Sequence, residues 1–118
     1  PGATAYTVAR WAMRGFSHAL RADLHGTNIG VTLVVAGKVS SAYFENNPGT
    51  EERLPKIGRL YPTLTPEQVA AAIVKAIQKN RREIIIPFSL YLTFQLHRFL
   101  PRLVESFVVR TGWQRPSL

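Results

Sequence analysis

Apolar side chains recur every three or four residues between residues 4 and 25. This spacing predicts an amphipathic helix with an apolar stripe along one side. Gly15, in mid-helix, either permits close packing against another backbone or is simply tolerated. Gly26 is expected to end the helix in a left-handed conformation. The stripe contains Ala5, Val8, Ala9, Ala12, Phe16, Leu20 and Leu24, and the polar residues outside it include Arg14, Ser17, Arg21 and Asp23.

Two short apolar runs, residues 29–36 and 84–86, predict strands buried on both faces of a parallel sheet. Between them, Thr65-Pro66-Glu67-Gln68 predicts a helix start, because threonine caps, proline suits the first position and glutamine completes a capping box. A helix that connects two buried strands implies a parallel pair with a right-handed connection. The fold class is therefore α/β, in the order helix, strand, loop, helix, strand, helix.

Residues 42–64 lack a clear period and contain several prolines and glycines. We expect a long, irregular, mobile loop, either a lid or binding segment or a poorly ordered surface excursion. The adjacent Glu51 and Glu52 are interpreted as a solvated pair rather than a catalytic dyad.

Residues 88–110 again have a helical pattern, which Pro101 is expected to kink or divide. Five charged or titratable residues exclude an ordinary membrane span. The large apolar face with basic flanks is expected to pack in a core, to contact a partner or to lie on a membrane surface. We define residues 88–118 as a carboxyl-terminal amphipathic extension of a single partial domain, 1–118.

The composition narrows the choice of partners. A hydrophobic fraction of 46% argues against disorder of the whole chain, and the absence of cysteine favours a reducing, cytoplasmic location. The net charge of +8 favours anionic partners, but Arg81-Arg82 is the sole adjacent basic pair, so no nucleic acid partner is expected. The three histidines, His18, His25 and His97, lack metal-ligand spacing, and no metal is expected.

The first helix also carries a chemical motif. Tyr6 and Arg10 are four residues apart and therefore share one helix face. A fixed cation beside a phenol favours the phenolate, so Tyr6 is a candidate general acid or base for an alcohol or carbonyl. The alternative interpretation is an ordinary tyrosine and a solvated arginine.

The motif and its surroundings resemble the carboxyl-terminal half of a short-chain dehydrogenase/reductase over residues 3–110. The resemblance rests on Tyr6-x-x-x-Arg10, on the helix that continues through Gly15-Phe16-Ser17, and on the segment from Gly30 to Gly37-Lys-Val-Ser-Ser41. It implies the end of a doubly wound, Rossmann-like parallel sheet. Family members carry Tyr-x-x-x-Lys on a helix, and the next strand ends in Pro-Gly-x-Val/Ile-x-Thr.

The resemblance assigns site residues by position. Tyr6 matches the catalytic acid/base, and Arg10 replaces the lysine that binds the nicotinamide ribose. Arginine keeps the charge but does not release its proton. The residues that match the turn at the nicotinamide carboxamide are Ala36, Gly37, Val39 and Ser41, with Ala36 in place of proline and Ser41 in place of threonine.

The chain lacks the family's glycine-rich phosphate loop and the serine that precedes the tyrosine. We therefore expect a fragment of an oxidoreductase that uses NAD or NADP on a small alcohol or carbonyl, inactive alone. The resemblance also implies a homo-oligomer in the intact parent. The alternative is a non-catalytic relative that acts as a binding or scaffold protein, with peripheral membrane contact through residues 88–110.

Overall fold

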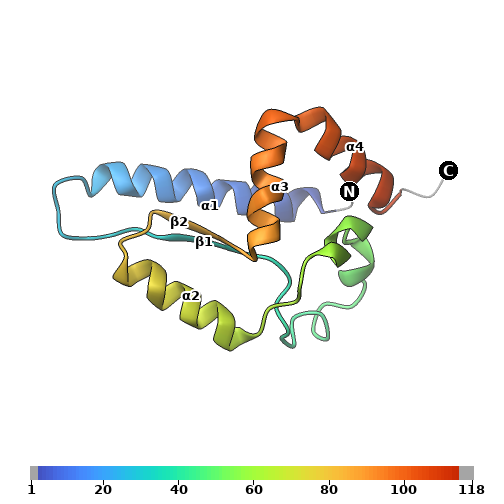
Figure 1. The fold of residues 1–118 in the computed structure, drawn as a ribbon, viewed down its shortest axis with the longest axis horizontal. Helices are drawn as coiled ribbons and strands as arrows, with labels where there is room; N and C mark the ends of the chain where they lie inside the picture. Colours follow the sequence, from blue (N-terminus) through green and yellow to red (C-terminus); the bar gives the residue numbers. More distant parts are fainter. Residues whose placement is uncertain (1–2, 115–118) are drawn as a thin grey trace.

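Two short parallel strands lie between helices at the centre of the structure (Figure 1). The computed structural model describes residues 3–114. Two 3₁₀ helices, η1 (Glu51–Arg53) and η2 (Lys56–Leu60), lie in the long loop between β1 and α2. The other elements are α1 (Thr4–Asp23), β1 (Leu33–Ala36), α2 (Pro66–Gln78), β2 (Glu83–Ile86), α3 (Phe88–Phe99) and α4 (Pro101–Thr111).

The sheet confirms an α/β architecture with parallel strands. β1 and β2 pair in register from Leu33 opposite Glu83 to Ala36 opposite Ile86. β1 is shorter than the predicted strand 29–36, because only the four residues Leu33–Ala36 pair with β2. The strand residues are only partly buried and Ala36 is exposed, since two strands cannot support a layer of helices on each face.

The predicted apolar stripe of α1 does not face the strands. Val8 and Phe16 are 63% and 60% exposed, whereas the polar Ser17 is buried. Arg14 pairs with the Glu83 carboxylate, and the Arg21 guanidinium donates to the carbonyl oxygens of Val31 (3.3 Å) and Arg82 (2.9 Å). The stripe is exposed because the strand starts present the Glu83 carboxylate and backbone carbonyl groups to α1, and the arginines on the opposite side of the helix bind these groups.

The predicted start of α2 is confirmed. The Thr65 hydroxyl accepts a hydrogen bond from the Gln68 backbone N–H (3.3 Å), and the Gln68 side chain accepts one from the Thr65 N–H (2.9 Å). Pro66 is the first helical residue. The hydrogen bond from the Thr65 side chain, followed by one from the backbone of Glu67 itself, holds the pKa of Glu67 below its ordinary value. The lowered pKa favours the ionised form of Glu67, which lies in the first turn near the positive end of the helix dipole.

The long loop has more structure than the sequence predicted. Besides η1 and η2, its two ends are held together by a parallel bridge between Val39 and Leu64. The Ser40 N–H donates to the Leu64 carbonyl (2.8 Å), and the Leu64 N–H donates to the Lys38 carbonyl (2.9 Å). The loop is thus closed at the point where β1 ends.

Pro101 divides the carboxyl-terminal segment into two helices, as predicted. Leu100 adopts φ −131° and ψ 61°, and Pro101 begins α4. α3 crosses α1, and α4 turns back at an angle to α3 (Figure 1). Residues 115–118 of the predicted extension lie outside the described residues. Within residues 3–114, no helix has both the length and the apolar character needed to cross a bilayer.

The chain exposes far more surface than a folded monomer of its mass. Its accessible surface is 9354 Å², against about 6,400 Å² expected for a compact protein of this size. Its radius of gyration is 16.2 Å, against about 13.5 Å expected. Among the described residues, only Ser17, Ala76 and Val104 are buried. Much of the apolar surface is therefore available to a partner or to further parts of a protein.

Candidate functional site

The tyrosine and arginine of the predicted motif are in contact. The Arg10 guanidinium carbon lies 4.8 Å from the centroid of the Tyr6 ring, a cation–π arrangement. The Tyr6 side chain is 52% exposed, and within residues 3–114 its hydroxyl makes no hydrogen bond. The hydroxyl is therefore accessible to a ligand, next to a fixed positive charge.

α1 runs antiparallel to the strands, and its first turns lie towards their carboxyl ends (Figure 1). Arg21 contacts carbonyl groups that precede both strands, whereas Arg14 pairs with Glu83 and lies 5.6 Å from the ring centroid of Phe94 in α3. At 1.5 Å per residue, Tyr6 is about 22 Å from Arg21 along the helix axis, while a strand of this length covers only about 13 Å. Tyr6 thus lies near or beyond the ends of the strands.

Tyr6 and Arg10 also continue the face of α1 that meets the strands. Arg10, Arg14, Ser17 and Arg21 follow one another at spacings of four, three and four residues, so they share one side of the helix. Tyr6 is one turn before Arg10 on that side. The motif is exposed because no segment of the described chain covers this end of α1.

The second group of predicted site residues follows β1. The N–H of Gly37 donates to the Ile86 carbonyl (2.8 Å), and a Cβ at Gly37 would lie 3.1 Å from Cδ of Pro87. Only glycine fits this approach without displacement. Ala36 is exposed at the end of β1 and pairs with Ile86.

Val39 and Ser41 occupy the base of the long loop. Val39 forms the bridge with Leu64, and the exposed Ser41 hydroxyl accepts a hydrogen bond from the Tyr43 N–H (3.4 Å). β1 is thus followed by the close backbone approach at Gly37 and, at the base of the loop, by the exposed Ser41 hydroxyl. In open α/β sheets this is where ligands bind.

The sequence did not predict two side-chain contacts, made by Lys38 and by Tyr61, that hold the loop at this edge of the sheet. Lys38 pairs with the Glu51 carboxylate, and its ammonium nitrogen lies 5.0 Å from the ring centroid of Phe44. The Tyr61 hydroxyl lies 2.7 Å from Oγ1 of Thr93 in α3. Glu51 and Glu52 are both exposed, as predicted, and Glu51 also forms the ion pair with Lys38. No local sequence signal links residues so far apart.

The two halves of the predicted site lie at the same end of the fold without forming a closed pocket. Among the described residues, no hydrogen bond or ion pair joins Tyr6 or Arg10 to the segment from Ala36 to Ser41. The same part of the chain contains no group of three acidic or histidine side chains that could hold a metal ion.

Comparison with known proteins gives distant relatives. The chain is 32% identical over 99 residues to an uncharacterized oxidoreductase of Mycobacterium tuberculosis (84% of this chain, 36% of that protein). It is 30% identical over 88 residues to a dehydrogenase/reductase SDR family protein 7-like of Anopheles gambiae (73% and 28%). It is 27% identical over 109 residues to 17-beta-hydroxysteroid dehydrogenase 13 of Rattus norvegicus (89% and 33%).

This chain is related to oxidoreductases. The relationship is distant, and the chain spans only between 19% and 36% of the length of the oxidoreductases with which it aligns. No family model matches it, and no solved structure does. The relatives agree with the resemblance to short-chain dehydrogenases/reductases drawn from the tyrosine motif.

The close approach of Gly37 to Pro87 gives a testable prediction. Gly37→Ala should destabilise the protein by about 1–2 kcal/mol, because Pro87 must shift to admit the methyl group. Gly15→Ala is the matched control: nothing lies within 4 Å of its Cβ position, and alanine should stabilise α1 by up to about 1 kcal/mol. Urea unfolding midpoints measure both. Equal effects of the two substitutions would contradict the packing at Gly37.

Proposed function

We propose that this chain supplies the proton-transfer side of an NAD(P)-dependent oxidoreductase of the short-chain dehydrogenase/reductase type. The observation that carries the proposal is the exposed Tyr6–Arg10 pair on the strand-facing side of α1, at the carboxyl ends of parallel strands. The oxidoreductase relatives support it. The substrate class is a small alcohol or carbonyl compound.

The residues of this chain fit the nicotinamide end of such a cofactor. The exposed Arg10 guanidinium offers donors to ribose hydroxyls, and the segment from Gly37 to Ser41, with the exposed Ser41 hydroxyl, offers polar groups to a carboxamide. When bound, the nicotinamide would exchange a hydride with the substrate carbon. Tyr6 donates its proton to the carbonyl oxygen in reduction, or removes it from the alcohol in oxidation, while Arg10 keeps a positive charge beside the phenol.

The phosphate end of the cofactor has no matching segment in these residues. We infer that a glycine-rich phosphate loop and the remaining strands belong to another part of the same protein. The large excess of accessible surface over that of a compact monomer supports this, as does the small share of each relative that the chain covers. The 118 residues alone are then inactive, and 88–118 form an extension of the shared domain.

The long loop is proposed to cover the substrate. Its base is closed beside Gly37 and Ser41, and its contacts with Lys38 and α3 hold it over the same end of the sheet as the tyrosine. Loops in this position exclude water and complete the site when substrate binds.

The outward face of α1 is proposed to pair with a second copy of the protein. Val8, Ala12 and Phe16 lie on this face and are exposed, although the sequence pattern is that of a buried stripe. An isologous contact between two such helices would bury these side chains.

The proposal predicts that Tyr6→Phe lowers kcat about 10²- to 10⁴-fold, because the phenylalanine cannot transfer a proton. The assay follows NADH or NADPH oxidation with a panel of ketones, in the whole protein that contains this chain. Tyr91→Phe is the matched control, since Tyr91 stacks on Phe88 through its ring and should not need its hydroxyl. Equal activity of the Tyr6→Phe variant and the control would reject a catalytic role for Tyr6.

A second prediction concerns Arg10. Arg10→Lys keeps the positive charge and should leave kcat/KM within about fivefold, whereas Arg10→Ala should lower it by about 10²-fold. Steady-state kinetics with varied cofactor measure both. If the wild-type protein binds cofactor or partners but turns over no substrate, and Arg10→Lys does not create activity, the non-catalytic scaffold function replaces the enzyme.

The proposed contact through α1 predicts that Phe16→Glu converts a dimer or larger oligomer into a monomer, because the contact cannot accommodate two buried carboxylates. Light scattering after size-exclusion chromatography measures the molar mass. The control is Ile77→Glu, an equally exposed apolar position on α2. A wild-type monomer, or loss of the oligomer in the control alone, would contradict the contact.

A further inference from the structure

The outer face of α3 and α4 is apolar. On α3, Phe88, Leu92, Leu96 and Phe99 follow one another at spacings of four, four and three residues and so form one stripe. All four side chains are exposed, Phe88 by 70% and Phe99 by 75%. A helix that presents two phenylalanines and two leucines to water has an unoccupied binding face.

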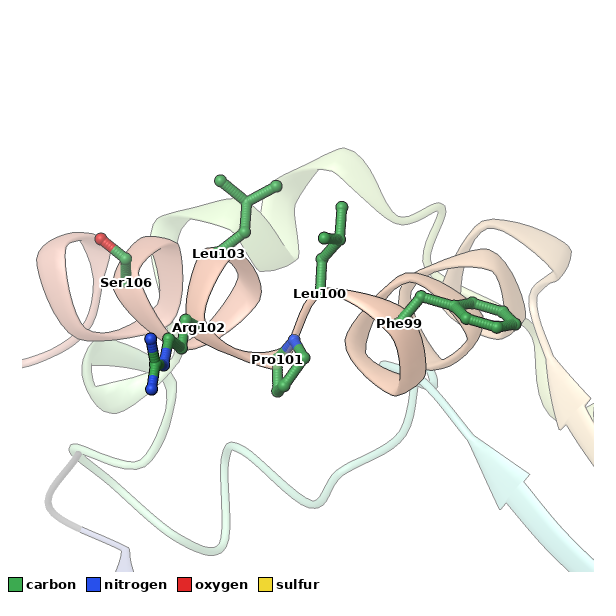
Figure 2. Close-up of a pocket in the computed structure, with 6 residues that line it drawn as sticks. All are labelled: Phe99, Leu100, Pro101, Arg102, Leu103 and Ser106. Atoms are coloured by element: carbon green, nitrogen blue, oxygen red, sulfur yellow. The ribbon is translucent and has the colours of Figure 1, made fainter.

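The stripe continues across the junction between the helices. Leu103 and Phe107 form an exposed apolar row on α4. A shallow hollow of about 550 Å³ connects the two rows, and Leu100 and Leu103 project to the same side of the junction (Figure 2). Its lining residues are Phe99, Leu100, Pro101, Arg102, Leu103 and Ser106.

The inner sides of both helices are already in use. On α3, Thr93 contacts Tyr61, and the ring of Phe94 faces Arg14. On α4, Val104 is buried. The apolar outer rows are therefore only partly covered by the described chain.

The charges beside these rows are almost all positive. Arg98, Arg102 and Arg110 are exposed, and within residues 3–114 none of them forms an ion pair. The one carboxylate in the segment, Glu105, lies 3.6 Å from His97 Nε2. An apolar surface with a basic margin suits insertion among acyl chains with arginines at anionic headgroups.

We propose that α3 and α4 form a docking surface for an anionic lipid membrane, with the apolar rows at the acyl boundary and the three arginines among the headgroups. Charge favours this occupant over a second copy of the chain. Two copies of this face would bring the exposed Arg98, Arg102 and Arg110 of each chain together and repel, whereas each arginine near an anionic bilayer strengthens binding about fivefold. This surface is separate from the proposed catalytic residues.

Vesicle flotation tests the proposal, with vesicles of phosphatidylcholine containing 30% phosphatidylglycerol and with pure phosphatidylcholine. We expect binding to the anionic vesicles that weakens at least tenfold in 0.5 M NaCl or without phosphatidylglycerol. Phe88→Ser with Phe99→Ser should abolish it. The matched control, Val74→Ser with Ile77→Ser, changes two exposed apolar residues of α2 and should bind like wild type.

A charge-matched pair separates this surface from general attraction of a basic protein. Arg98→Gln with Arg102→Gln should weaken binding about 25-fold, whereas Lys75→Gln with Lys79→Gln, which removes the same charge from α2, should change it less than twofold. Circular dichroism checks that each variant is folded. Equal losses in the two pairs would overturn the proposal. The proposal would also be overturned if the protein bound no vesicles and formed a dimer that the double substitution Phe88→Ser with Phe99→Ser dissociates. A second copy of the chain would then occupy the surface.

Discussion

The narrow sheet is the constraint on which the rest of this structure depends. Two strands of four residues each provide little apolar area for three flanking helices. α1 is consequently held at the strand starts by Arg14 and Arg21, through a carboxylate and backbone carbonyl groups. The apolar side chains of α1, α3 and α4 are left in solvent, and the chain keeps a surface well above that of a compact monomer.

This constraint also explains how the candidate site is built. The arginine contacts fix α1 antiparallel to the strands, and its polar face continues through Arg10 to Tyr6. At the same end, Gly37 packs against Pro87, and the bridge between Val39 and Leu64 closes the loop. Strand pairing and helix docking thus bring distant residues to one edge, although this chain alone does not enclose a ligand there.

Local patterns predicted much of the fold. The capping box at Thr65 and the division at Pro101 depend on neighbouring residues, and the parallel pairing of the strands follows from the helix that connects them. The side of α1 that meets the strands did not follow from the sequence, because an amphipathic pattern says that one face is apolar but not that this chain covers it.

The loop contacts depend on residues far apart in the chain. Lys38 with Glu51 and Tyr61 with Thr93 join positions that no periodic pattern connects. The contact between Tyr6 and Arg10 could be predicted from the sequence, because the two residues are one helical turn apart. Its position at the end of the sheet follows from the contacts of Arg14 and Arg21 with the strand starts, which the apolar pattern does not reveal.

The central claim is that these residues work with a cofactor-binding half outside them. The most direct measurement is the coding sequence of the transcript upstream of Pro1. The account predicts a continuous reading frame that encodes a glycine-rich phosphate loop after a strand, and a serine shortly before Tyr6. A start codon next to Pro1, with no such segment, would contradict the claim and favour a binding protein without dehydrogenase activity.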